Sequence, residues 1–117
     1  MRRAVLLAVS VCALALAIAG ASAASGSKSH TVKVEDDFYT PVKLTVKAGT
    51  KVHWAWDSGN YDVHDVRLKS GPRGVRKFKS ALAASDYSFT KKLTVAGTYK
   101  IYCSMHRTMR MTIVVKK

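Results

Sequence analysis

The sequence predicts an all-β fold, a sandwich or barrel of short strands, on two observations. After residue 30, apolar residues alternate with polar ones at a period of two, which is typical of strands with one buried face. Glycine-containing turn sequences at 48–50, 58–60, 71–72 and 96–98 separate these runs. The whole chain has 117 residues, enough for one domain.

The strands are expected where apolar residues recur two positions apart, in the order 32–34, 42–46, 52–54, 93–95, 99–103 and 113–115. The valines, leucines and isoleucines of these runs, together with Trp54, Phe38, Phe78 and Phe89, are expected to form the core. The segment 79–86 lacks the alternation and is expected to contain a short helical turn.

The N-terminus resembles an export signal. Arg2 and Arg3 precede an uncharged apolar run at 4–19, and the small residues Ala21-Ser22-Ala23 follow. A membrane anchor fits less well, because the run is short and alanine-rich. We therefore expect residues 1–23 to be a cleaved signal peptide, 24–30 a flexible leader and 31–117 the folded domain, in the periplasm or outside the cell.

The chain is strongly basic, with 20 lysines and arginines against 7 acidic residues. Without Arg2 and Arg3, 18 basic residues remain and the net charge is +11. Such a charge attracts acidic proteins or an anionic membrane surface. Nucleic acid is not expected as a partner, because the chain has an export signal and no recognisable nucleic-acid-binding module.

The cysteine count is unusual for an exported protein, because exported proteins usually pair their cysteines. Cys12 lies in the predicted signal peptide, which leaves Cys103 without a partner. Cys103 is then an inert thiol, an intermolecular link or a metal ligand.

Three soft or borderline donors lie close together after the run at 99–103. Cys103, His106 and Met109 follow the spacing Cys-x2-His-x2-Met. A thiolate, imidazole and weakly bound thioether are ligands of blue copper, which also requires a second histidine. Zinc is chemically able to use the same donors.

The second histidine is expected to be His64. It follows a turn-rich loop, and loops at the end of a sandwich often hold binding residues. His53 lies between Val52 and Trp54 and should point to solvent, whereas His30 ends the leader.

Met105 and Met111 are the alternatives to Met109 as the thioether ligand. Met105 lies between Cys103 and His106, where binding the same metal would strain the loop. Met109 and Met111 would point to the same side of a strand, so geometry alone separates them poorly.

Across nearly the whole predicted mature chain, the sequence resembles the cupredoxins, and within them the plastocyanin and amicyanin group. The matching motifs are Phe38-x-x-Pro41, Leu44-x-Val46-x-x-Gly49-Thr50-x-Val52-x-Trp54, Val63-His64-Asp65-Val66, Phe78-x-Ser80, Tyr87-x-Phe89-Thr90 and Gly97-Thr98-Tyr99-x-x-Tyr102-Cys103-x-x-His106-x-x-Met109.

The resemblance implies a Greek-key β-sandwich of about seven to eight strands with one copper ion near one end. It implies close copper binding by His64, Cys103 and His106 and axial binding by Met109. Met111 occupies a position where the family usually has glycine, which favours Met109. Tyr99 resembles the family's tyrosine corner.

The resemblance also implies that the edge of His106 reaches the surface as the exit for electrons, surrounded by Met105, Arg107, Thr108 and Pro72. Two departures from the family pattern concern this region. Asp65 replaces an asparagine that ties the two ligand loops together in many relatives. Met105 and Arg107 occupy positions where proline is common.

These observations predict a soluble, monomeric one-electron carrier whose copper cycles between Cu(I) and Cu(II). Its partners are expected to be acidic redox proteins, such as a cytochrome or a copper enzyme. We do not expect an enzyme, because no general base, nucleophile or substrate pocket is evident. A copper delivery or storage protein is the main alternative, since Met105, Met109 and Met111 are clustered; a purely structural domain is another.

Overall fold

The computed structural model describes residues 28–117, so the predicted signal peptide and most of the leader lie outside the described residues. The chain forms eight strands: β1 (Ser29–Glu35), β2 (Phe38–Thr40), β3 (Lys43–Lys47), β4 (Thr50–Trp56), β5 (Arg67–Ser70), β6 (Ser88–Leu93), β7 (Gly97–Tyr102) and β8 (Arg110–Lys116). Because β1 begins at Ser29, the last two residues of the predicted leader belong to a strand.

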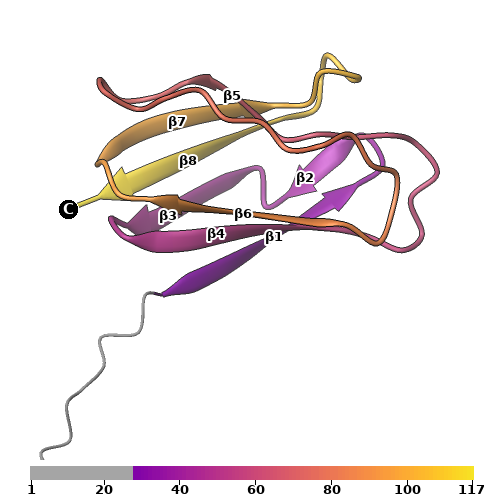
Figure 1. The fold of residues 1–117 in the computed structure, drawn as a ribbon, viewed down its shortest axis with the longest axis horizontal. Coiled ribbons are helices and arrows are strands. Elements are labelled where there is room, and N and C mark those ends of the chain that lie inside the picture. Colours follow the sequence, from indigo (N-terminus) through magenta and orange to yellow (C-terminus); the bar gives the residue numbers. More distant parts are fainter. Residues whose placement is uncertain (1–27) are drawn as a thin grey trace, which may run out of the picture.

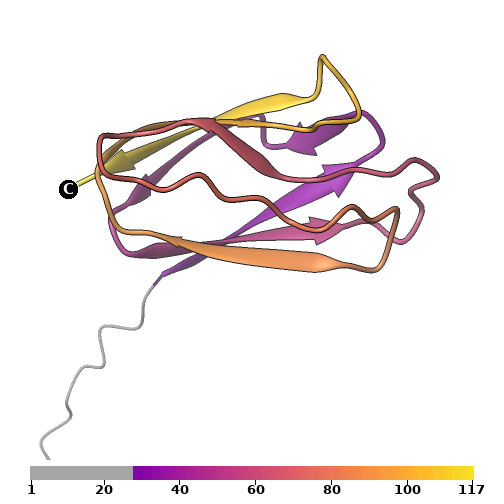
Figure 2. The same cartoon turned by 45° about the horizontal axis from the view of Figure 1, so that its top comes forward.

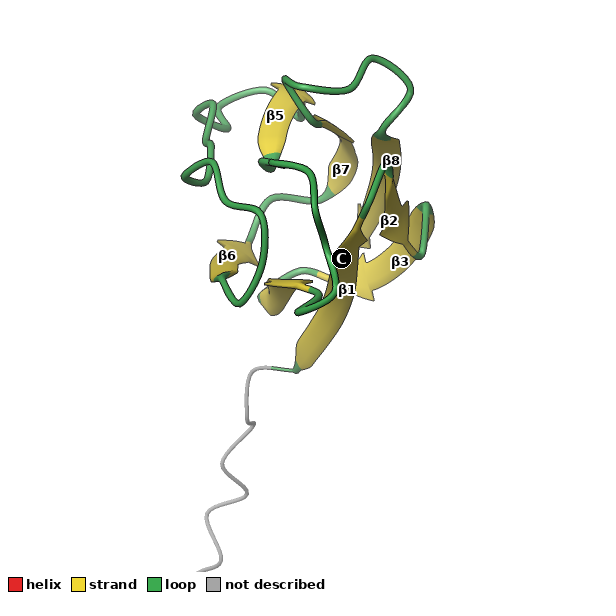
Figure 3. Cartoon of the chain, turned by 90° about the vertical axis from the view of Figure 1, so that its right-hand side faces the viewer, coloured by secondary structure: helices red, strands yellow, loops and turns green. Residues whose placement is uncertain are grey.

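The strands form two sheets of four, in the orders β2-β1-β4-β6 and β3-β8-β7-β5. The sheets lie face to face as two layers (Figures 1 and 3). β1 pairs in parallel with β4, and β3 pairs in parallel with β8, so the chain crosses between the sheets rather than forming successive hairpins. This arrangement confirms the predicted Greek-key β-sandwich.

The predicted helical turn at 79–86 is wrong. Between residues 28 and 117 no residue is helical, and none of the searched residues forms a helix that could span a membrane. The backbone of this segment instead pairs with the loop that precedes β5. Ser80 N donates to Val66 O at 2.8 Å, and Ala83 N donates to His64 O at 3.1 Å.

The alternating apolar residues form the core between the sheets, as predicted for most of them. Val32, Val52, Trp54 and Ile113 are fully buried, and Trp54 packs near Phe78 and Phe89.

Three residues that were expected in the core are exposed instead. Phe38, Val42 and Val95 are 49%, 60% and 40% exposed. Phe38 is at the start of the short strand β2, and the two valines lie just outside β3 and β6, where the sheet no longer covers them.

The predicted tyrosine corner is present. The Tyr99 hydroxyl donates to Val95 O at 2.6 Å, four residues earlier in the chain. This contact fixes the turn into β7, the strand that leads directly to Cys103.

Three loops meet at the right-hand end of the sandwich in Figures 1 and 2. They are the two-residue turn between β1 and β2, the loop 57–66, and the loop 103–109 between β7 and β8. Hydrogen bonds join the 57–66 loop to each of the other two, and this end of the molecule contains the predicted metal ligands.

Candidate metal centre

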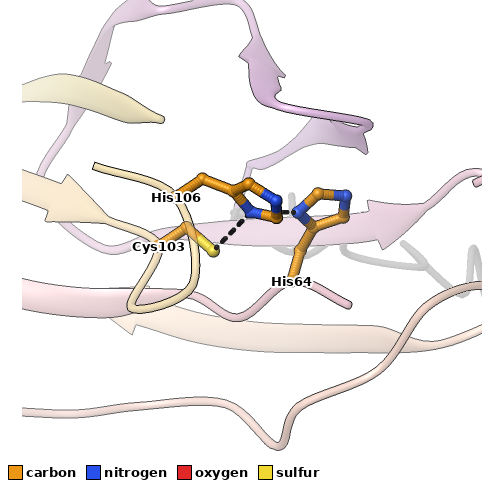
Figure 4. A group of neighbouring side chains, drawn as sticks. All are labelled: His64, Cys103 and His106. Carbon is orange, nitrogen blue, oxygen red and sulfur yellow. Dashed lines mark hydrogen bonds between the residues drawn. The ribbon is translucent and has the colours of Figure 1, made fainter. Parts of the chain in front are cut away.

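The structure brings together three of the four predicted ligands from two loops that are distant in sequence. One donor atom from each of His64, Cys103 and His106 lies within 4.8 Å of the others. His64 Nδ1 is 3.2 Å from His106 Nδ1, and Cys103 Sγ is 3.7 Å from the same nitrogen (Figure 4).

These separations fit donors that share one metal ion. Nitrogen and sulfur ligands bind such ions at about 2.0 to 2.3 Å, and a trigonal arrangement then places the donors about 3.5 to 3.7 Å apart. The observed 3.2 and 3.7 Å are close to this spacing without any movement of the backbone.

The backbone of His64 is held from two sides. Its N–H donates to Ala83 O at 2.9 Å, and its carbonyl accepts from Ala83 N and from Trp56 Nε1. The side chain is fully buried. His64 is therefore positioned by the segment 79–86, for which the sequence predicted a helical turn and no contact with the site.

In both candidate ligand histidines, His64 and His106, the second ring nitrogen, Nε2, lies against a carboxylate. His64 Nε2 lies 2.9 Å from Asp36 Oδ1, and His106 Nε2 lies 3.1 Å from Asp37 Oδ1. A carboxylate accepts the Nε2 proton and leaves Nδ1 free to bind a metal, which is how outer carboxylates orient metal-binding histidines. The carboxylates thus favour the tautomer that a metal site on Nδ1 needs.

Asp36 also anchors the loop that carries His64. Its carboxylate accepts from the backbone N–H groups of Tyr61 and Asp62. These bonds, first the one from Tyr61 and then the one from His64, lower the pKa of Asp36 below its usual value. Asp36 therefore remains an ionised acceptor at neutral pH.

The sequence prediction missed Asp36 and Asp37 as functional residues. They form the two-residue turn between β1 and β2, in which Asp37 has a left-handed φ of 70° that aspartate tolerates better than most residues. The sequence did contain one signal, a run of three consecutive acidic residues, Glu35 to Asp37, in a strongly basic chain.

Asp65 joins the two loops that carry the candidate ligands, the role that the resemblance implies for asparagine at this position. Its carboxylate accepts from Ser104 N and Ser104 Oγ, both at 2.7 Å, and from Arg67 Nε at 2.6 Å. Burial alone would raise the pKa of Asp65, but the bonds from Ser104 and then Arg67 outweigh it and lower the pKa. The buried side chain is therefore charged and paired.

A further hydrogen bond joins Asp65 to β2 in the opposite sheet. The Tyr39 hydroxyl donates to Asp65 O at 2.6 Å. Burial raises the pKa of Tyr39 well above its usual value, so this hydroxyl stays protonated and remains a donor.

The three methionines of the loop region have different surroundings. Met109 is fully buried, its N–H donates to His106 O at 3.2 Å, and its carbonyl accepts from Cys103 N at 3.0 Å. Met111 is buried in the core, where Trp54 Nε1 donates to its sulfur at 3.4 Å. Met105 is 56% exposed. Only Met109 is joined through its backbone to both neighbouring candidate ligands.

The other two histidines of the described residues lie away from this centre. His53 is on β4, and its Nδ1 lies 2.6 Å from Thr90 Oγ1. His30 is exposed on β1.

The surroundings of His106 differ from the expectation. Its Nε2 approaches Asp37 and, at 3.9 Å, Asp62, so this edge is acidic. Pro72 is not at this edge: it lies against Gly97 at the start of β7, whereas His106 follows the end of that strand. The chain turns through 71–74 at the opposite end of β5.

Comparison with known proteins supports this description. The family model of the cupredoxin-like domain matches residues 6–115. Amicyanin from Paracoccus versutus is 29% identical over 85 residues, which cover 73% of this chain and 63% of that relative. The chain thus spans less than two thirds of this relative's length.

Solved structures agree with the fold. A reduced Cu(I) form of an amicyanin variant matches with a TM-score of 0.65 and 28% identity, over 82% of this chain and 88% of that one. A copper-containing nitrite reductase from Thermus scotoductus matches with a TM-score of 0.65 over 74% of this chain and 22% of the enzyme, but at 22% identity it bears on the fold alone. The chain belongs to the cupredoxin-like domain family.

Proposed function

We propose that this protein binds one copper ion through His64, Cys103, His106 and Met109 and carries single electrons between redox proteins. The observation that carries the proposal is the convergence of two imidazole Nδ1 atoms and one thiol at 3.2 and 3.7 Å. Two imidazoles and a thiolate form the trigonal donor set of blue copper, and the resemblance to a Cu(I)-containing amicyanin supports the same metal.

Met109 is proposed as the weak axial ligand. Its backbone bonds to Cys103 and His106 keep it beside the three strong donors, whereas the sulfur of Met111 already accepts a hydrogen bond from Trp54. This hydrogen bond from Trp54 supports Met109 over Met111 as the proposed axial ligand, whereas strand geometry alone separates the two poorly.

The chain supports electron transfer by keeping its donors in place. A copper ion bound here supplies a Cu(I)/Cu(II) couple. Asp36 and Asp37 orient the imidazoles, and Asp65 joins the loop of His64 to that of Cys103. Donors held this firmly change position little between oxidation states, which favours electron exchange over substrate chemistry. We accordingly propose a carrier rather than an enzyme.

Adding Cu(II) to the purified protein tests the copper assignment. An intense absorption band in the red part of the spectrum is expected, and Cys103→Ser should abolish it because the band requires the thiolate. Ser104→Ala is the matched control: it removes one hydroxyl next to the cysteine, is not a ligand, and should leave the protein blue. A wild-type protein that stays colourless with Cu(II) would overturn the proposal.

Two leucine substitutions test the axial ligand. Met109→Leu should shift the absorption spectrum and the reduction potential markedly. Met111→Leu should alter stability through the lost contact with Trp54 while leaving the spectrum nearly unchanged. The reverse pattern would assign Met111.

Copper delivery or storage is less well supported. Such a role would use exposed methionines, yet Met109 and Met111 are buried and Met105 alone of the three is exposed. Binding of Cu(I) without a blue Cu(II) form would favour it.

We further propose that the protein is exported after cleavage behind Ala23 and works as a soluble monomer outside the cytoplasm, with an acidic redox protein as partner. The mass of the protein recovered from the periplasmic or culture fraction tests the cleavage site. Sedimentation analysis tests the monomer.

A further inference from the structure

The face of the sandwich next to the proposed metal site contains a groove, and Cys103 is one of its lining residues. It has a volume of about 740 Å³ and lies between β5, the segment 77–79, the end of β7 and the loop 103–109. Leu68 N donates to Phe78 O at 3.0 Å, which holds the segment 77–79 beside β5. The groove is therefore a fixed part of the fold.

The lining of the groove is basic around an aromatic floor. Phe78 and Tyr102 are half-buried in it, and its described lining residues include no carboxylate. Six cations surround them: Arg67, Lys69, Lys77, Lys79, Arg107 and Arg110. Arg67 is paired with Asp65, whereas the other five form no ion pair within residues 28–117.

The pairing of the strands explains why the charges gather here. Tyr102 lies opposite Arg67 on β5 and opposite Arg110 on β8, and directly opposed residues point to the same face of a sheet. A second, smaller hollow adjoins the groove through Lys69 and Arg110 and adds Lys100. The basic surface therefore continues along the outer face of β5, β7 and β8.

We propose that this basic groove, defined by the residues that line the larger hollow, is the docking site for an acidic protrusion of the redox partner. Charge complementarity selects the occupant, because an acidic protein segment can meet five unpaired cations while packing on Tyr102 and Phe78. A flat anionic membrane fits less well, because the surface is concave.

The groove lies beside the proposed metal site, so a partner bound there is close enough to exchange electrons with it. Tyr102 is bonded directly to Cys103, and both line the groove, so a docked partner lies one residue away from the proposed copper thiolate. The His106 edge, in contrast, faces Asp37 and Asp62 and should repel an acidic partner. The inference rests on the proposed carrier function, since it assigns where electrons enter or leave.

An octaglutamate peptide provides a direct test of the groove. Amide signals of the reduced, copper-loaded, 15N-labelled protein are followed by NMR at low ionic strength while the peptide is added. Shifts should concentrate on Lys69, Lys77, Lys79, Tyr102 and Arg110. Shifts spread evenly over all exposed lysines, or concentrated near Asp37, would overturn the proposal.

Charge reversal identifies the cations responsible. Lys77→Glu and, independently, Lys79→Glu should each weaken peptide binding roughly tenfold, because a two-unit charge change acts on carboxylates a few ångströms away. Lys51→Glu is the matched control: it makes the same change in net charge on the opposite sheet and should weaken binding less than threefold. Equal effects at all three positions would mean a net-charge effect and no groove site.

The same variants separate docking from membrane contact and from the copper function. Oxidation of the reduced protein by hexacyanoferrate(III), which takes one electron as Cu(I) becomes Cu(II), should slow more in Lys77→Glu than in Lys51→Glu. If Lys77→Glu instead reduces binding to phosphatidylglycerol vesicles and leaves peptide binding unchanged, the groove is a membrane contact. If the protein binds no copper, the carrier function fails while the peptide titration still decides the groove.

Discussion

Replacing Asp65 tests whether one buried carboxylate joins the two ligand loops. The wild-type side chain is fully buried and accepts three hydrogen bonds, two from Ser104 and one from Arg67. Asp65→Ala removes all three. Asp65→Asn keeps the shape and one acceptor for Ser104 N but removes the charge.

The expected magnitudes follow from the exposure of the partners. A hydrogen bond to a charged group contributes about 1.5 to 3 kcal/mol, but Ser104 is exposed and the Arg67 side chain is 32% exposed, so water replaces part of each loss. We expect Asp65→Ala to lower the free energy of unfolding by about 2 to 3 kcal/mol, and Asp65→Asn by about 1 kcal/mol. For a domain of this size the alanine variant should then melt about 10 to 20 °C lower.

The assay is thermal unfolding of the metal-free protein as a function of pH. The folded pKa of Asp65 lies below the usual 3.8, so its charge stabilises the fold fully well above that value. The stabilisation is lost as pH falls through 3.8 towards the folded pKa. The stability difference between wild type and Asp65→Asn should therefore be constant at neutral pH and shrink in acid.

Two results would refute this reasoning. If Asp65→Asn lowered the free energy of unfolding as much as Asp65→Ala, the hydrogen bond from Ser104 N that asparagine can keep would contribute nothing to stability. If the difference between wild type and Asp65→Asn persisted unchanged in strong acid, the charge on Asp65 would contribute nothing to stability.

Three further predictions concern residues that support the candidate metal site without binding the metal. Tyr99→Phe should lower the free energy of unfolding by about 1 kcal/mol, measured by urea denaturation, because it removes one hydrogen bond and little volume. Gly97→Ala should lower the free energy of unfolding by about 2 kcal/mol or more in the same assay. The reason is that φ at Gly97 is +141° and the new Cβ would lie 2.5 Å from Pro72 Cγ. An unchanged urea midpoint would contradict this turn geometry. Asp36→Ala should reduce copper affinity about 10- to 100-fold in competition with a chelator, because it removes the carboxylate that contacts the proposed ligand His64. Asp57 is an exposed acid that contacts neither candidate histidine, so Asp57→Ala should leave the affinity unchanged.

Much of the fold could be predicted from the alternation of apolar and polar residues and from the glycine-containing turns. The period of two located strands on both sides of Gly49 and Gly97, and the resemblance to cupredoxins supplied the two-sheet arrangement. The helical turn at 79–86 was wrong because the backbone of that segment pairs with His64 and Val66, a long-range contact that local pattern does not contain.

The sequence by itself determined the local part of the site. Cys103, His106 and Met109 lie within seven residues of one loop, so their spacing and donor chemistry are visible without a structure. Their proximity follows from the covalent chain, which cannot separate them far. The identification of His64 already required an argument about where loops meet.

Only the tertiary structure decided what surrounds these donors. His64 meets His106 across 42 residues, Asp36 meets His64 across 28, and Asp65 meets Ser104 across 39. The proposal of Met109 rather than Met111 as axial ligand rests partly on Trp54, which lies 57 residues before Met111. Such contacts arise from the stacking and register of two sheets, which bring distant loops to one end of the sandwich. No local pattern in the sequence encodes those distances.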